Sequence, residues 1–141
     1  MRISTKGRYG LAVMIKLAEN DGQVISIATL SSELGLSKIY LEQVLALLKA
    51  GDLVTSLKGP QGGYLLSRSN LNLREILSVL EPGLFEATEA SCSDNILNHV
   101  LSEKVYDPIQ QNLYKLLETI LLESLVSTLI DRRQETPMFY I

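Results

Sequence analysis

The stretch SIATLSSELGLSKIYLEQVLALLKA, residues 26–50, decides the fold. Ser26 and Ser37 each precede an amphipathic segment and suit a helix N-cap, because a serine hydroxyl can accept from the free backbone amides of a first turn. Gly35 can end the first segment in a left-handed conformation. Apolar residues follow helical spacing in both segments, at Ile27, Leu30 and Leu34 and then at Leu41, Val44, Leu45 and Leu48. The pattern predicts two helices joined by a tight turn, a helix-turn-helix.

A β-hairpin is expected directly afterwards, in LVTSLKGPQGGYLLS, residues 53–67. Two strand-like runs, 53–57 and 64–67, flank a Gly-rich loop that contains one Pro. The loop lacks the G-x-x-x-x-G-K-[S/T] pattern of a nucleotide-binding P-loop. A helix-turn-helix followed by a hairpin is the winged-helix arrangement. We therefore predict a mainly α fold with a small β-hairpin, a winged helix-turn-helix.

Two further helices are expected to complete this module. Thr5 is a possible cap of the first, and its predicted core face consists of Leu11, Met14, Ile15 and Ala18, widened on one side by Val13 and Leu17. Val24 and Ile25 could form a very short strand. After the hairpin, Asn72 and Glu75 have the spacing of a capping box. The apolar stripe of that helix is Leu73, Ile76, Leu77 and Leu80.

The carboxyl-terminal part is more apolar than a small monomer needs. Asp107 followed by Pro108 predicts the start of a long helix, and Thr119 could cap a second helix that turns back. We expect the apolar stripe to form a dimer interface, through Ile109, Leu113, Leu116, Leu117, Ile120 and Leu121. The alternative is a helix packed wholly within its own subunit.

Four regions follow from these patterns. We predict a winged helix-turn-helix DNA-binding domain at 1–82, a loop and short helix at 83–106, a dimerisation helix region at 107–130 and a tail at 131–141.

Composition narrows the class of protein. The 141 residues include one Cys and one His, so an intramolecular disulfide framework is excluded. The chain shows no apolar run of membrane-spanning length and no signal peptide. We therefore expect a cytoplasmic protein without a membrane partner. No catalytic triad or metal-ligand spacing is present, so an enzyme is not expected.

The charge is divided unevenly along the chain. Residues 1–70 carry a net charge of +3, whereas residues 71–141 carry −6. This asymmetry favours contact of the first half alone with a polyanion such as double-stranded DNA. The alternatives are chance scatter of solvated charge and a protein that uses the same fold to bind other proteins.

Candidate DNA contacts come from three places. The second helix of a helix-turn-helix enters the major groove with its N-terminal part, where Glu42 can accept from cytosine and Gln43 can bond adenine. Basic side chains near the amino end could clamp phosphates. The candidates are Ser37, Lys38, Tyr40, Glu42 and Gln43 in the helix, Lys58, Gly59 and Gln61 in the hairpin loop, and Arg2, Thr5, Lys6 and Arg8 at the amino end. Each is also an ordinary surface residue.

Three motifs occur in order along the chain: MRISTKGRYG at residues 1–10, YLEQ at 40–43 and GPQGGY at 59–64. Together they resemble the signatures of the IscR/CymR/NsrR (Rrf) family of bacterial regulators, over essentially the whole chain. The resemblance implies a winged-helix DNA-binding domain and a long dimerisation helix that crosses between subunits. It also implies DNA contacts at the start of the recognition helix and in the wing.

Many members of this family hold an iron–sulfur cluster through three Cys in the loop before the dimerisation helix. Here Cys92 is alone in that loop, and Asn98 and Lys104 stand roughly where further Cys would fall. A cluster commonly needs four Cys, or Cys with His, which Cys92 and His99 cannot supply within one chain. We therefore expect a cluster-free member without a cofactor or metal.

Redox sensing through the Cys92 thiol is the alternative function. Neither sequence neighbour, Ser91 or Ser93, is a base that would favour the thiolate. An incidental Cys92 is the favoured interpretation.

The end of the chain, TPMFYI at residues 136–141, resembles the branch of the family that regulates cysteine metabolism. In that branch the regulator is tuned by cysteine synthase (O-acetylserine thiol-lyase), an enzyme that captures partner chains ending in Ile. The resemblance thus implies a homodimeric repressor of cysteine or sulfur-metabolism genes, with Phe139, Tyr140 and Ile141 docking on cysteine synthase. The alternative is that these residues pack on the protein's own dimer surface.

Overall fold

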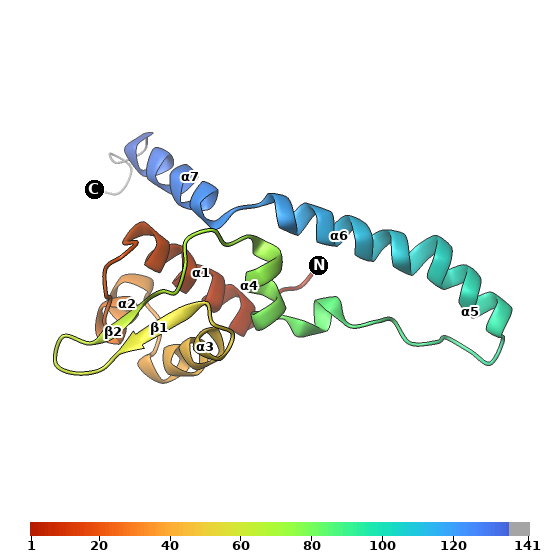
Figure 1. Cartoon of the computed structure of the whole chain (residues 1–141), viewed down its shortest axis with the longest axis horizontal. Coiled ribbons are helices and arrows are strands. Elements are labelled where there is room, and N and C mark those ends of the chain that lie inside the picture. Colours follow the sequence, from red (N-terminus) through yellow and green to blue (C-terminus); the bar gives the residue numbers. More distant parts are fainter. Residues whose placement is uncertain (136–141) are drawn as a thin grey trace.

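A winged helix-turn-helix and a long helical arm make up the computed structural model, which describes residues 1–135 (Figure 1). The tail residues Phe139, Tyr140 and Ile141 lie outside the described residues. The expected mainly α fold with a small β-hairpin is confirmed. In chain order the elements are α1 (Thr5–Glu19), α2 (Ile27–Leu34), α3 (Lys38–Ala50), β1 (Val54–Leu57), β2 (Gly63–Leu66), α4 (Leu73–Leu80), the 3-10 turn η1 (Pro82–Phe85), α5 (Asn95–Leu101), the π-helical turn η2 (Ser102–Tyr106), α6 (Asp107–Thr119) and α7 (Leu122–Glu135).

The predicted caps set the ends of the helix-turn-helix. The Ser26 hydroxyl accepts from the Thr29 amide at 3.1 Å, and the Ser37 hydroxyl accepts from the Tyr40 amide at 3.2 Å. Gly35 ends α2 with φ +66°, a left-handed conformation in which glycine has no side chain to strain. Ser26, Ser37 and Gly35 each set one end of a helix, as predicted.

The core face of α1 is displaced from the predicted one. Val13, Met14 and Leu17 are fully buried, whereas the predicted Leu11, Ile15 and Ala18 are only half-buried. The reason is Gly10, which precedes these residues at helical spacing and has no room for a side chain beside Leu80 of α4. Because a glycine has no apolar side chain, the apolar pattern of the sequence does not show that Gly10 belongs to the buried face, and it places the centre of that face one position away.

The wing is an antiparallel hairpin in the predicted place. Its register pairs Val54 with Leu66 and ends at Leu57 with Gly63. The expected short strand at residues 24–25 is a single bridge, in which Ile25 exchanges backbone hydrogen bonds of 2.9 and 2.8 Å with Tyr64. This bridge ties the wing to the start of the helix-turn-helix.

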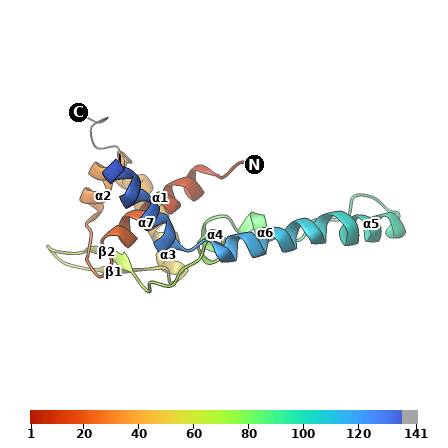
Figure 2. The same ribbon diagram turned by 90° about the horizontal axis from the view of Figure 1, so that it is seen from above.

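The arm is one helical rod formed by α5, η2 and α6, and it extends away from the module (Figure 2). Helix α6 starts at Asp107 with Pro108 in its first turn, as predicted, but Asp107 does not cap a free helix end. The rod already begins at Asn95, where Asp94 is the cap, and the helical backbone continues through Asp107. The π-helical turn before Pro108 changes the hydrogen-bond spacing, with the Asp107 amide donating to the Ser102 carbonyl. Pro108, which has no amide hydrogen, therefore follows without breaking the rod.

The chain turns sharply between α6 and α7. The Leu73 amide donates to the Ile120 carbonyl and the Leu122 amide donates to the Leu71 carbonyl, both at 2.9 Å. Thr119 was predicted as a possible cap of α7. Its hydroxyl instead donates back to the Leu116 carbonyl at 2.7 Å. These bonds direct α7 back over α1 (Figure 1). None of the helices within residues 1–135 is both long and apolar enough to cross a bilayer.

Candidate nucleic-acid interface

Helix α3 divides into a buried side and an exposed side. Leu41, Val44, Leu45 and Leu48 are fully buried in the module. Lys38, Glu42 and Gln43, the predicted base-reading residues, are exposed on other sides of the same helix. The structure therefore presents these three polar side chains together, on the first two turns of the recognition helix.

Tyr40 is less available than predicted. It is half-buried, and its ring packs edge-on against Tyr9 of α1, with ring centroids 4.9 Å apart and an interplanar angle of 71°. Such edge-to-face pairs are favourable packing contacts. Tyr40 thus holds α3 against α1. Tyr9, which was not among the predicted residues, supports α3 from the side of α1.

The loop of the wing carries three exposed candidates, Lys58, Gly59 and Gln61. Gly59 has φ +107°, a backbone conformation that side chains disfavour, so the sharp turn depends on glycine. Lys58 shares a groove with Lys49, from the last turn of α3, and with the start of α2 at Ser26. Sequence reasoning missed Lys49, because only the fold brings it near the wing.

The amino end lies beside α4. Ser4, not the predicted Thr5, caps α1 by accepting from the Gly7 amide at 3.0 Å, while the Ser4 amide donates to Glu81 at 2.6 Å. This second bond pins Ser4 in the extended conformation that a cap requires. The Thr5 hydroxyl instead accepts from Arg8 at 3.2 Å.

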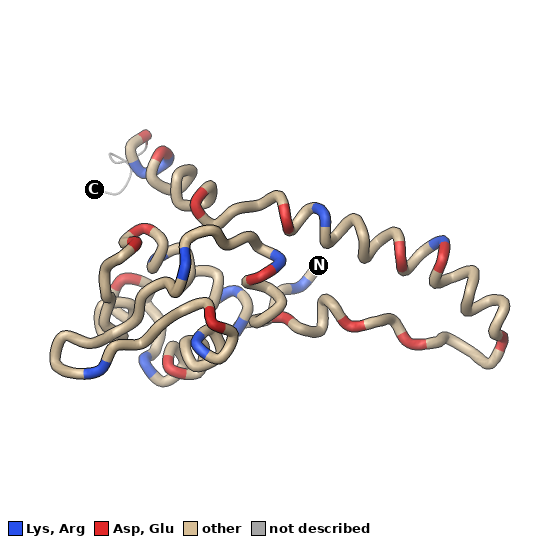
Figure 3. Tube along the Cα trace, viewed as in Figure 1, with Lys and Arg blue, Asp and Glu red and all other residues tan. Residues whose placement is uncertain are grey.

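The basic candidates of the amino end, Arg2, Lys6 and Arg8, are exposed. Since Tyr9 packs on Tyr40, the N-terminal halves of α1 and α3 are neighbours. In Figure 3 the module carries basic residues along α3 and at the tip of the wing, whereas acidic residues dominate the loop before α5 and recur along the arm. The uneven charge of the sequence is therefore also uneven in space.

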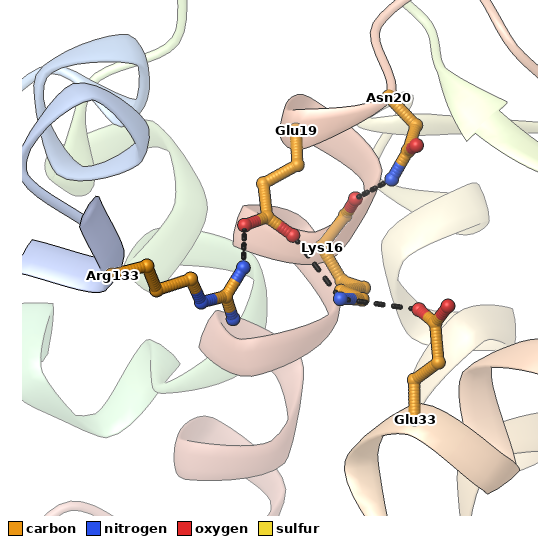
Figure 4. Close-up of polar contacts among 5 residues, drawn as sticks. All are labelled: Lys16, Glu19, Asn20, Glu33 and Arg133. Carbon is orange, nitrogen blue, oxygen red and sulfur yellow. Dashed lines mark hydrogen bonds and ion pairs between the residues drawn. The ribbon is translucent and has the colours of Figure 1, made fainter. Parts of the chain in front are cut away.

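A chain of ion pairs joins α7 to the helix-turn-helix (Figure 4). Lys16 of α1 lies 3.2 Å from Glu19 and 3.1 Å from Glu33 of α2, and Glu19 also pairs with Arg133 of α7. Burial lowers the pKa of Lys16, but hydrogen bonds and charge from Glu33 and Glu19 outweigh it and raise this pKa overall. The network fixes the far end of α7 against the module.

The root of the arm is fixed to α4. Arg74 pairs with Glu118 and lies over the ring of Tyr114, 4.1 Å from its centroid. Phe85 also stacks on the Tyr114 ring, with the two ring centroids 5.5 Å apart. These contacts within one chain fix the direction in which the arm leaves the module.

The predicted dimerisation residues differ in exposure and form three groups. Ile109, Leu116 and Leu121 are exposed, Ile109 by 64% and Leu116 by 58%, and Leu113 and Ile120 are half-buried. Leu117 is 6% exposed within its own chain, so it has little surface left to offer a partner. It lies on the side of α6 that packs on α4, one helical turn from the α4-bound Tyr114.

Cys92 lies in a loop held by Asn98 of α5. The Asn98 side chain accepts from the Ser91 amide at 3.0 Å and donates to the Cys92 carbonyl at 2.6 Å. The Cys92 thiol is exposed and faces the Asp94 carbonyl at 3.9 Å and the Asn98 amide oxygen at 3.7 Å. Both oxygens are hydrogen-bond acceptors, and neither is a base that would favour the thiolate.

Comparison with known proteins identifies relatives over the whole chain. The model of the Rrf2 family, described as iron-dependent transcriptional regulators, matches residues 3–128. The regulator CymR of Bacillus subtilis is 35% identical over 144 residues, all of both chains. Its solved structure, titled as that of the global cysteine regulator, has a TM-score of 0.76 at 30% identity and covers 91% of this chain and 98% of its own. The structure of IscR from T. potens has a TM-score of 0.70 at 29% identity, covering 96% and 91%.

The iron in the family's description does not fit this chain. Iron–sulfur clusters are held mainly by several thiolates, and the sequence has one Cys. Within residues 1–135 no three His, Cys, Asp or Glu side chains are grouped to hold a metal ion, and Asn98 occupies the inner side of the Cys92 loop. The full-length matches rest instead on the winged helix and arm, and the chain belongs to the Rrf2 family of transcriptional regulators.

Proposed function

We propose that this regulator binds promoter DNA as a homodimer and represses genes of cysteine or sulfur metabolism. Family membership supports a DNA-binding regulator. The observation that carries the proposal further is the full-length likeness to CymR, in a chain whose helix α3 exposes Lys38, Glu42 and Gln43 and whose wing exposes Lys58. Side chains of these types bond phosphates and the base edges of the major groove.

The exposed apolar side chains of the arm support the homodimer. Ile109 and Leu116 are exposed on α6, with the half-buried Leu113 at helical spacing between them, and Ile96 and Val100 are exposed on α5. Apolar surface of this extent is usually covered by a partner. A two-fold dimer would present two recognition helices to half-sites roughly one helical turn of DNA apart, about 34 Å, and so would bind an imperfect palindrome.

Selection of duplexes from a random library tests DNA binding directly. We expect an enriched imperfect palindrome, with an affinity that falls steeply as salt rises because phosphate contacts release counterions. Lys58→Ala should weaken binding to most sequences, whereas Gln43→Ala should change the preferred sequence. Absence of enrichment, or an affinity independent of salt, would contradict the proposal. Transcription of cysteine genes with and without the protein tests repression.

Capture by cysteine synthase is a separate part of the proposal. The tail residues Phe139, Tyr140 and Ile141 resemble segments that dock on this enzyme through a carboxyl-terminal Ile. Deleting Tyr140 and Ile141 should abolish capture by the purified enzyme and leave operator binding intact. Capture of the shortened chain would exclude the docking role, without affecting the DNA-binding part.

Redox sensing is a second candidate, supported by the exposure of the Cys92 thiol. Replacing Cys92 by Ser should abolish any response of operator binding to peroxide. An identical peroxide response of the Cys92→Ser variant would exclude this candidate.

A further inference from the structure

Ile39 is an exposed apolar residue in the middle of a polar surface. It is the second residue of α3 and is 73% exposed. Most other exposed large apolar side chains belong to the arm or to α7, where the proposed dimer accounts for them. In the module, residues 1–81 of the described structure, Ile39 shares this property with Met1 and Leu57. Single exposed apolar residues are common on protein surfaces, so the position of Ile39 on α3 carries the argument that follows.

The position of Ile39 on the helix identifies the direction it faces. With about 3.6 residues per turn, Ile39 lies opposite the buried side formed by Leu41 and Leu48. Gln43 follows Ile39 by four residues and Glu42 by three, so both are its neighbours on the helix surface. Ile39 is consequently at the centre of the exposed face of α3, between the side chains predicted to read bases.

The arm is not the partner that this side chain faces. The arm leaves the module at α4, through Arg74 and Tyr114, while α3 lies at the lower edge of the module in Figure 1. Folding also gives no reason for the residue, because a β-branched side chain on a solvent-exposed helix surface is a weaker helix former than alanine and gains no burial.

We propose that Ile39 is a specificity-determining residue that packs on the C5-methyl group of a thymine in the major groove. The thymine methyl is the apolar group that the edges of the four bases present there, and contact with it is a known form of base readout. The first turn of a recognition helix is the part that reaches base edges. The inference rests on the proposed DNA-binding function and adds thymine to the bases read.

Replacing thymine by deoxyuridine in the selected operator, one position at a time, tests this proposal, because uracil differs from thymine by that methyl alone. For the wild-type full-length chain we expect one position in each half-site at which the change weakens binding about 3- to 5-fold, the value of one buried methyl group. Ile39→Ala should bind the thymine operator more weakly and show no further loss with deoxyuridine at that position.

Lys38→Ala is the matched control, since it changes the neighbouring exposed residue and should weaken binding to the thymine and deoxyuridine duplexes equally. Helical content by circular dichroism should be unchanged in both variants, because both side chains are exposed. An undiminished deoxyuridine effect in Ile39→Ala, or no sensitive position in the wild type, would overturn the role of Ile39 while operator binding itself stands. No binding to any selected duplex would overturn the proposed function as well.

Discussion

The module and the arm bury their apolar residues in opposite ways. In the module, α1, α3, the wing and α4 enclose side chains such as Met14 and Leu45 completely, and basic residues occur along α3 and at the tip of the wing. The arm is a single helical rod with Ile96 80% and Ile109 64% exposed. The module thus closes its core within one chain, whereas the arm leaves large apolar side chains exposed, which the proposed homodimer would cover.

Shortening a core side chain of the module should have the largest effect on folding. Leu45→Ala removes a fully buried side chain, and we expect it to lower the free energy of unfolding by about 2–5 kcal/mol. Urea unfolding followed by circular dichroism measures this loss. A loss under about 1 kcal/mol would show that the module is not the closed core described here.

The opposite pattern is expected in the arm. Ile109→Ser should leave the unfolding of the separated chain nearly unchanged but weaken self-association at least 10-fold, since one buried isoleucine contributes about 1.5–3 kcal/mol. Sedimentation equilibrium measures the dimer constant. Lys115→Ser, at an exposed polar position of α6, is the control. Equal dimer constants for Ile109→Ser and the control would remove Ile109 from the interface.

The ion network provides a smaller test, at the place where the end of α7 meets the module. Glu19→Gln removes the charge that pairs with both Lys16 and Arg133. We expect a loss of about 1 kcal/mol or less in the free energy of unfolding, because Arg133 is largely exposed and surface pairs contribute little. Glu123→Gln, on an exposed position of α7, should have no effect. An equal loss in both variants would contradict the network's role.

The smallest expected effect concerns the pH dependence of the module. The backbone amide of Asn72 donates to the Glu75 carboxylate and lowers its pKa. Burial opposes this shift, and the nearby Arg68 adds to it. A pKa lowered in the folded state stabilises the fold above the ordinary Glu pKa, and this contribution disappears as the pH falls through the folded value. Glu75→Gln keeps a capping acceptor but not the charge. Its stability deficit should therefore be present at pH 7 and vanish in acid; a deficit independent of pH would contradict this.

Local chemistry explains how much of the fold could be predicted. Ser26, Ser37 and Gly35 act within a few residues of themselves, and the structure confirms all three. What could not be predicted concerns contacts between distant segments: Gly10 lets α4 approach α1, α6 packs on α4 at the buried Leu117, and Glu81 holds Ser4 as the cap. The start of α6 at Asp107 follows from the sequence, but its continuity with α5 does not, because no local pattern indicates the π-helical turn that joins them.

The candidate site shows the same division. Lys38, Glu42, Gln43 and Lys58 follow from the position of a recognition helix and a wing, and the structure exposes all of them, although their contacts with DNA stay predictions. Lys49 and Tyr9 could not be found in this way, because each joins the site through the fold alone. Ile39 was visible in the sequence, but its meaning depends on how exposed it is.

Sedimentation of the full-length chain, alone and with its selected palindromic duplex, tests the central claim most directly. The central claim is that each chain folds its own DNA-binding module and pairs with a second chain through the arm. The chain should then sediment as a dimer of 15.6 kDa subunits, and one duplex should bind two chains. A stable monomer that leaves the duplex unbound at low salt would contradict it.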